Sequence, residues 1–239
     1  MDETASTKAA VGRTGHGSIR GIREFVAPGG PEQEEGVFFG AAVASTKGRE
    51  RVRQILDEAL NIIVADGFEG LTLRSVARGA KITIGNLQHY FATHDDLLRA
   101  TTRYILHNYL QEYDRLADLH KGDALHQFEA TMRFLIEDCK DPRTNAIFFS
   151  LWALAQRNSF ASEMMDLMYC DHRQSIEKQL AAINPHMPKD MRPIRAALIA
   201  VQIEGLMLLI AANRPKHAEL RGIEEECLNQ ILRLAHSSE

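Results

Sequence analysis

The segment Thr83–Tyr90 gathers side chains that can form paired hydrogen bonds with the bases of DNA. Asn86 and Gln88 each offer one amide donor and one amide acceptor, the combination that can read adenine in the major groove. Gly85 has no side chain, so the backbone can approach a surface closely there. The segment therefore predicts a short helix that presents these residues, together with His89, to base edges.

Two short helices joined by a tight corner would hold this segment in place. Thr72 is a good N-cap for a first helix that runs through about Arg78, and Thr83 is a good N-cap for a second that runs to about Phe91. The turn between them would span residues 79–82. The stretch therefore predicts a helix-turn-helix whose second helix enters the major groove.

A longer helix is expected before this unit. From Val52 to Ile63 apolar residues recur at i, i+3, i+4, i+7, i+8 and i+11, which is one face of a helix that Gly67 should end. Four basic residues crowd its start: Lys47, Arg49, Arg51 and Arg53. Because the helix dipole favours acids there, we predict that the bases serve a phosphate backbone, with a simply solvated face as the alternative.

From the first helix through Leu98, the sequence resembles the N-terminal DNA-binding domain of the TetR family of bacterial transcriptional regulators. The resemblance rests on the spacing of these residues: Ala77, Thr83, Gly85, Leu87, His89, Tyr90, Phe91 and the run Asp95-Asp96-Leu97-Leu98. It implies repression of transcription and release of the operator when a small molecule binds. It also implies that the last two long helices form a four-helix dimer interface.

Three residues depart from the family pattern. Lys81 stands where the family usually has glycine, Gln88 replaces a customary tyrosine, and His94 replaces a customary lysine. A left-handed backbone at Lys81 would carry a strain cost. The full predicted set of DNA-contacting residues is Lys47, Arg49, Thr72, Arg74, Thr83, Gly85, Asn86, Gln88, His89, Tyr90 and His94.

The chain beyond Thr93 reads as helix throughout, with no alternating strand pattern. The expected helices are 94–119, 123–139, 142–157, 160–183, 189–213 and 220–236. The sequence thus predicts an all-α protein in three parts: a flexible N-terminal extension (1–46), a three-helix DNA-binding domain (47–93) and a helical ligand-binding and dimerisation domain (94–239).

The segment from Arg195 to Ala212 is apolar on nearly every side, apart from Gln202 and Glu204. The two polar residues and the length of about eighteen residues argue against a membrane span. We predict instead a homodimer through 189–213 and 220–236, which would read a palindromic operator in double-stranded DNA. The alternative is a helix wholly buried in a monomer.

The middle helices carry aromatic and methionine side chains with a few polar groups among them. Such a lining suits an apolar small-molecule effector with one or two polar anchors, although plain core is the alternative. The predicted lining is Tyr104, Phe148, Phe149, Trp152, Gln156, Met168, Tyr169, His172 and Glu204.

Composition limits the other function classes. The net charge of −4 argues against non-specific coating of nucleic acid, so any DNA contact must come from a local patch. Three widely spaced cysteines indicate neither a disulfide framework nor a zinc site, and a reducing cytoplasm is the expected compartment. The sequence has no HExxH, GxSxG or phosphate-loop motif, so we predict no catalytic residues, cofactor or metal.

The N-terminal region carries two nearby arginines and a short apolar run. Arg20 and Arg23 could add an arm to the DNA surface, whereas Val37–Ser45 is expected to be neither a signal peptide nor a membrane span. The alternative to a regulator is a helical interaction or assembly module whose DNA-binding face has degenerated.

Overall fold

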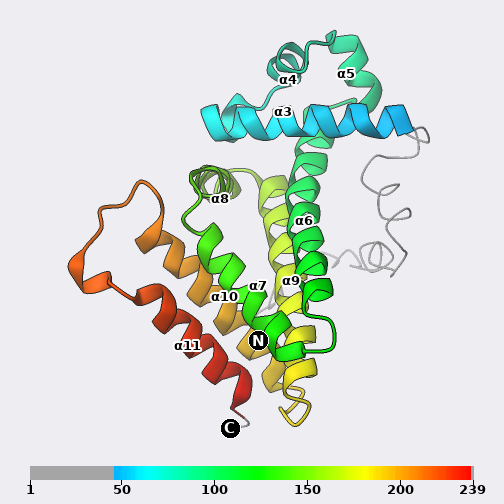
Figure 1. Ribbon diagram of the computed structural model, residues 1–239. Helices are drawn as coiled ribbons and strands as arrows, with labels where there is room; N and C mark the ends of the chain where they lie inside the picture. Colours follow the sequence, from blue (N-terminus) through cyan, green and yellow to red (C-terminus); the bar gives the residue numbers. More distant parts are fainter. Residues whose placement is uncertain (1–45, 238–239) are drawn as a thin grey trace, which may run out of the picture.

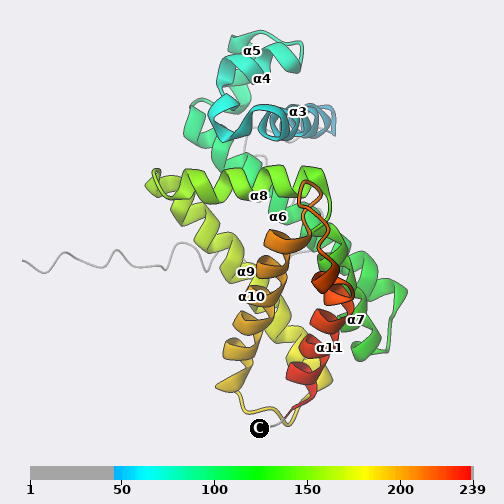
Figure 2. The ribbon, with the colours of Figure 1, turned by 90° about the vertical axis from the view of Figure 1, so that its left-hand side faces the viewer.

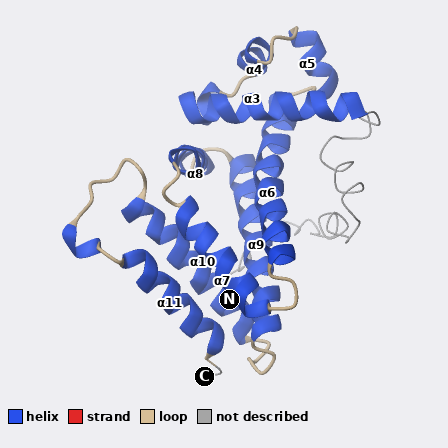
Figure 3. Ribbon diagram, in the orientation of Figure 1, coloured by secondary structure: helices blue, strands red, loops and turns tan. Residues whose placement is uncertain are grey.

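The computed structural model describes residues 46–237, and this part of the chain is helical and contains no strand (Figure 3). The fold is therefore all-α, as predicted. The expectations for the N-terminal extension, including Arg20, Arg23 and Val37–Ser45, lie outside the described residues. The helices are α3 (Thr46–Gly70), α4 (Leu73–Gly79), α5 (Ile84–Tyr90), α6 (His94–Leu119), α7 (Ala124–Asp138), α8 (Pro142–Ala155), α9 (Ser159–Ile183), α10 (Met191–Ile210), the short 3-10 helix η1 (Ala218–Leu220) and α11 (Ile223–His236).

Helices α3, α4 and α5 form a small unit at one end of the molecule, with α4 and α5 on the side of α3 that faces away from the rest (Figure 1). The apolar face predicted for the first helix is its buried face, and Ile55 and Ile63 are fully buried. Val76 of α4 and Leu87 of α5 complete this core, each with 0% exposure. Gly67, at φ 69°, interrupts α3 where the sequence predicts its end.

Helix α6 connects this unit to the larger body below it (Figure 1). Thr93 caps its start, since the Thr93 hydroxyl accepts from the backbone N–H of Asp96 and the Asp96 carboxylate accepts from the backbone N–H of Thr93. About three turns further on, the Tyr104 hydroxyl donates to Asp57 Oδ1 of α3 at 2.8 Å. The head of α6 is thus bonded to the unit above it.

The larger body consists of α7, α9, α10 and α11 packed with the lower part of α6, while α8 crosses between this bundle and α3 (Figure 2). Phe128, Leu151 and Ile176 are among its fully buried side chains. The buried Asn145 joins two corners of the body: its amide donates to the Cys139 carbonyl at 2.8 Å and accepts from the backbone N–H of Ala212 at 3.0 Å. Burial of this amide is tolerated because both of these hydrogen bonds are made.

Several helix ends differ from the sequence prediction by a few residues. Helix α10 ends at Ile210 rather than 213, because Ala211 adopts an extended backbone. Helix α11 begins at Ile223 rather than 220, because Gly222 is left-handed at φ 85° and separates it from η1. The buried Arg195 of α10 donates to the carbonyls of Leu234 and Ser237, where the C-terminal dipole of α11 favours a cation.

Candidate nucleic-acid interface and interior cavity

Helix α5 is fixed by one cap and one buried side chain. The Thr83 hydroxyl accepts from the backbone N–H of Asn86 at 3.2 Å, and Leu87 is fully buried beneath the helix. The remaining predicted contact residues of this helix, Gly85, Asn86, Gln88 and His89, are all exposed. The residues of α5 that are predicted to contact bases are therefore accessible to a partner.

Gly85 leaves that surface open to close approach. A Cβ atom built on Gly85 would meet no atom within 4 Å, so the backbone of α5 can come near a duplex. Tyr90, at the end of the helix, is half-buried, and its ring makes an edge contact with His89 at 5.3 Å between centroids.

The corner between α4 and α5 contains the left-handed residue anticipated at Lys81, which has φ 54°. A non-glycine residue in this region costs about 1 kcal/mol or more. Hydrogen bonds on both sides hold the corner, from Lys81 N–H to the Arg78 carbonyl and from Ile82 N–H to the Ala77 carbonyl at 2.9 Å. The turn conformation is thus retained without glycine.

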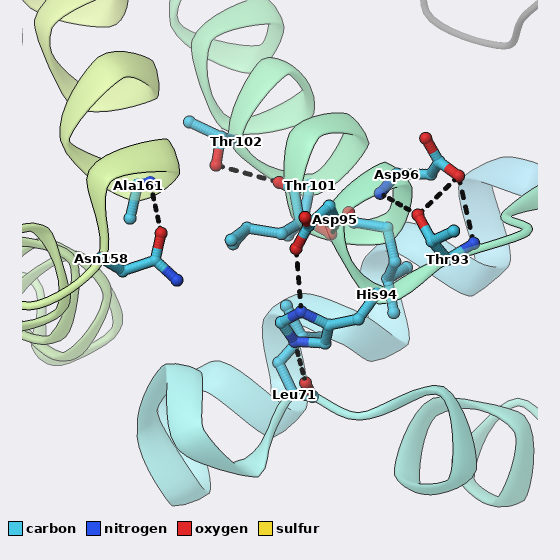
Figure 4. A network of polar contacts seen from close by, with 11 residues as sticks. Leu71, Thr93, His94, Asp95, Asp96, Thr101, Thr102, Asn158 and Ala161 are labelled. Atoms are coloured by element: carbon cyan, nitrogen blue, oxygen red, sulfur yellow. Dashed lines mark hydrogen bonds and ion pairs between the residues drawn. The ribbon is translucent and has the colours of Figure 1, made fainter.

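Thr72 and His94 have structural partners in this fold. Thr72 forms a capping box with Ser75, whose backbone N–H donates to the Thr72 hydroxyl at 3.0 Å. Nε2 of His94 lies 2.8 Å from the Leu71 carbonyl and donates to it, which ties the head of α6 to the α3–α4 connection (Figure 4). Nδ1 of the same ring lies 3.6 Å from Asp95 Oδ1.

The basic residues predicted to contact phosphates lie at two helix starts. Lys47 and Arg74 are exposed in the first turns of α3 and α4, and Arg49 is half-buried. Arg53 lies within 3.5 Å of Glu50 on the same helix. Basic charge is therefore available at both helix starts, while α5 itself contributes amides and an imidazole.

A cavity with about 550 Å³ of atom-free space, part of it open to solvent, lies inside the larger body. Its lining comes from α6, α7, α8, α9 and α10, and Cys139 follows α7. The lining residues are Leu106, Tyr109, Leu110, Tyr113, Leu135, Asp138, Cys139, Phe148, Met168, Tyr169, His172, Ile203, Glu204 and Met207.

Five of the nine residues predicted for such a cavity line it: Phe148, Met168, Tyr169, His172 and Glu204. The other four lie elsewhere. Tyr104 is bonded to Asp57, Phe149 packs edge-on against Trp152 at 5.5 Å, and Gln156 is the exposed C-cap of α8. Trp152 lies behind the lining and donates from Nε1 to the Tyr169 hydroxyl at 2.8 Å.

The side of the cavity formed by α6 was not predicted. Leu106, Tyr109, Leu110 and Tyr113 fall at i, i+3, i+4 and i+7, so helical spacing could have indicated a single inward face. Asp138 was missed as well, because a carboxylate at the last residue of a helix gives no sign in sequence that it points inward.

Asp138 accepts hydrogen bonds from two hydroxyl groups. Tyr109 donates to Oδ2 at 2.5 Å and Thr144 donates to Oδ1 at 3.0 Å. Burial raises the pKa of Asp138, and the two hydroxyl hydrogen bonds act in the opposite direction by favouring its charged form.

The cavity contains two further ionisable groups, His172 and Glu204. The Tyr113 hydroxyl lies 3.2 Å from His172 Nδ1, and burial lowers the pKa of His172 to about 4, so this imidazole is neutral at pH 7. Glu204 Oε2 is buried and has no hydrogen-bond partner among the described residues. Burial raises the pKa of Glu204 to about 7, and the Tyr169 hydroxyl acts against this rise.

A second cavity, with about 600 Å³ of atom-free space, lies against α3. Leu60 of α3 lines it together with residues of α6, α7 and α8, and it shares Tyr109, Asp138 and Phe148 with the first cavity. At its rim, Arg143 donates to the Asn61 side chain of α3 at 2.9 Å. Tyr109, Asp138 and Phe148 therefore lie between the interior of the larger body and the unit formed by α3, α4 and α5.

Helix α10 exposes an apolar stripe along one side. Its members are Ile194, Leu198, Val201, Leu208 and Leu209, with exposed fractions of 43% to 66%. Length and a mean hydropathy of 1.7 would allow this helix to cross a membrane, but its other face packs on the helices of the body. Gly205 lies within the stripe, and a Cβ built there would meet nothing within 4 Å. The exposed residues of α11 include Glu225, Glu226 and Arg233 and are polar.

Comparison with known proteins gives consistent results. A family model described as "Bacterial regulatory proteins, tetR family" matches residues 55–101. An uncharacterized HTH-type transcriptional regulator from the dhlA 5′ region of Xanthobacter autotrophicus is 30% identical over 145 residues, which are 57% of this chain and 69% of that protein. The HTH-type nicotine-responsive transcriptional repressor HdnoR of Paenarthrobacter nicotinovorans is 24% identical over 175 residues, covering 72% and 90%.

Solved structures share the architecture at lower sequence identity. A transcriptional regulator from Rhodococcus sp. Rha1 superposes with a TM-score of 0.59 over 76% of this chain and 95% of that one, at 20% identity. At this identity the likeness concerns the fold. It agrees with the helical arrangement of Figure 1, in which a small N-terminal unit stands on a larger helical body.

Proposed function

Because the chain belongs to the TetR family of bacterial transcriptional regulators, we propose that it is a homodimeric repressor that leaves its operator when a small molecule binds. DNA-binding regulation follows from the family, and the two relatives compared above are transcriptional regulators. We assign residues 47–93 to DNA binding and 94–239 to ligand binding and dimerisation, in the cytoplasm. The observation that carries the proposal is the exposed amide surface of α5 on a capped and anchored helix.

In the proposed complex, α5 lies in the major groove and the helix starts face the phosphates. Asn86 and Gln88 pair with base edges, and Gly85 allows the close approach that such pairs need. Lys47 and Arg49 of α3 neutralise phosphates. Thr72 and Thr83 hold the two helices at their N-caps, so they act on DNA binding chiefly through the shape of the unit.

We assign the dimer interface to the exposed side of α10, with α11 beside it. The stripe from Ile194 to Leu208 repeats at intervals of four and three residues, the spacing of a helix that packs against another helix. Gly205 lets two backbones approach. The charged outer side of α11 suits the rim of such an interface better than its centre. A two-fold axis would place two copies of α5 on half-sites about one helical turn, or a multiple of it, apart.

The proposed effector site is the interior cavity. Most of its lining is apolar, as in typical small-molecule sites. The relative HdnoR is a repressor that responds to nicotine, which supports a small-molecule response in this chain as well. A ligand can release DNA only if it binds the arrangement that cannot engage the operator better than the one that can.

The test is binding of the full chain to the DNA that flanks its own gene, followed by fluorescence anisotropy over a range of salt concentrations. We expect a dimer by light scattering and an affinity that falls as salt rises, because phosphate contacts release counterions. Absent or salt-insensitive binding at low ionic strength would overturn the regulator proposal. That result would favour the helical assembly module instead.

A further inference from the structure

The carboxyl group of Glu204 is the polar group of the interior cavity that the fold leaves incompletely bonded. Its Oε2 atom is buried without a hydrogen-bond partner among the described residues. A buried carboxylate oxygen without a partner costs free energy, and burial is usually tolerated only where a partner arrives. The group therefore points to a ligand that brings a donor or a positive charge.

The other polar groups around the cavity have partners within the protein. Tyr109 donates to Asp138, and Trp152 donates to the Tyr169 hydroxyl. The Tyr113 hydroxyl lies within hydrogen-bond distance of His172. Because these heteroatoms are engaged with one another, the tyrosines offer a ligand mainly their rings, next to the ring of Phe148.

No lysine or arginine lines the cavity within the described part of the chain. Besides Glu204 of α10, its ionisable lining groups are Tyr109 and Tyr113 of α6, Asp138 and Cys139 at the end of α7, and Tyr169 and His172 of α9; α8 contributes only Phe148. The imidazole is neutral at pH 7, since burial lowers the pKa of His172 to about 4. The charge facing a ligand can therefore only be negative.

We propose that this cavity binds an organic cation, namely an amine or quaternary ammonium on a small apolar body, with the cationic group against Glu204. This inference rests on the proposed function only in taking the cavity as the effector site. Aromatic rings attract cations through their faces, and the apolar lining buries the remainder of the ligand. An anionic ligand would meet two carboxyl groups and no compensating cation.

Binding of a cation should change the protonation of Glu204. Since burial raises the pKa of Glu204 to about 7, the group is about half protonated at neutral pH in the empty cavity. A permanent cation favours the ionised carboxylate, so binding releases the carboxyl proton to solvent. More protons are released at pH 6 than at pH 8, so affinity for a permanent cation should rise with pH across this range.

The experiment compares benzyltrimethylammonium with its uncharged isostere neopentylbenzene, using the full chain without DNA. Trp152 is the only tryptophan of the chain and is bonded to the cavity residue Tyr169, so its fluorescence reports on ligand entry. We expect saturable binding of the cation at pH 8, at least about tenfold tighter than the isostere. The affinity of the cation should fall towards pH 6, and that of the isostere should not change.

Glu204→Gln keeps the side-chain shape and removes the charge. It should weaken binding of the cation at pH 8 at least about tenfold, abolish its pH dependence and leave the isostere unaffected. Glu163→Gln, at an exposed position of α9, is the matched control and should change none of these. The pH dependence of the unaltered protein is a second test that needs no variant to fold.

Several results would overturn the cation inference: no saturable binding of the cation, equal affinity for both probes, or equal behaviour of Glu204→Gln and the unaltered chain. Because the assay contains no DNA, its outcome is separate from that of the proposed function. A cation that binds as expected but leaves the operator complex intact would contradict the ligand response and not the binding class.

Discussion

Replacing Asn86 with alanine should reduce discrimination between operator and scrambled DNA while leaving α5 folded. Alanine favours helix more than asparagine does, and the cap uses the backbone N–H of Asn86, which the substitution retains. The Asn86 side chain is exposed, so its removal opens no cavity. A change in DNA binding can therefore be attributed to the contact rather than to local unfolding.

The expected magnitude follows from the geometry of the proposed dimer. A bidentate amide–adenine pair contributes about 1–3 kcal/mol of discrimination, and two half-sites double this to about 2–6 kcal/mol. Affinity for the operator should then fall about thirtyfold or more, because about 1.4 kcal/mol corresponds to a factor of ten. Affinity for scrambled DNA should change little.

Arg49→Ala provides the contrasting case. A phosphate contact carries no sequence information, so this substitution should weaken operator and scrambled DNA alike and lower the salt slope by about one per protomer.

The measurement for Asn86→Ala and Arg49→Ala is fluorescence anisotropy on both DNAs at several salt concentrations, with melting temperatures recorded in parallel. Gln111→Ala, which removes an exposed amide from α6, is the control and should behave like the unaltered chain. Equal losses on operator and scrambled DNA from Asn86→Ala would refute the assignment of this residue to base readout.

Three further substitutions test the cap, the dimer surface and the cavity. Thr83→Ala should lower stability by about 1 kcal/mol through loss of the α5 cap, and Thr83→Ser should restore it in thermal unfolding; equal melting of the two variants would contradict the cap assignment. Val201→Glu places a charge on the exposed side of α10, where the Val201 side chain is 66% exposed. Light scattering should then show monomers that melt normally but have lost operator binding. A persistent dimer would exclude α10 as the interface. Tyr109→Phe removes a hydrogen-bond donor from the half-buried Asp138 and should cost about 1–3 kcal/mol, or roughly 2–12 °C in melting temperature. An unchanged temperature would count against that hydrogen bond.

Helix positions were predictable wherever one apolar face is coupled to clear end signals. The spacing from Val52 to Ile63 indicated the buried side of α3, and Thr72 and Thr83 indicated the caps of α4 and α5. Ends set by backbone conformation were predicted less well. Gly222, for example, separates α11 from a short 3-10 turn, and a sequence does not show whether a glycine will be left-handed there.

The cavity was predicted less well than the helices because helical spacing gives the face of a residue but not its depth in a bundle. Tyr104 and Tyr109 lie five residues apart on α6, yet the first is bonded to α3 and the second lines the cavity. The contact made by His94 could not be predicted from helical spacing either. A histidine in place of a lysine suggested a DNA contact, and only the folded chain brings its ring to the Leu71 carbonyl, 23 positions away in sequence.

The two carboxyl groups of the cavity differ in a way that bears on regulation. Glu204 has an oxygen without a partner, so it can add affinity for a ligand without breaking any protein contact. Asp138 is held by Tyr109 and by Thr144 in the first turn of α8. Since a ligand shifts an equilibrium only through a difference in affinity between two arrangements, the contact with Glu204 would contribute to a response only if it differed between them.

A response requires contacts that change when the cavity fills, and those of Asp138 are suitably placed. Thr144 precedes the buried Asn145 and follows Arg143, which donates to Asn61 of α3. A ligand that drew Asp138 away from Thr144 would therefore act on the first turn of α8, which packs against α3, the helix that supports α4 and α5. If the chain responds to a ligand as proposed, we expect Glu204 to contribute affinity and the hydroxyl contacts of Asp138 to differ between the DNA-binding and released states.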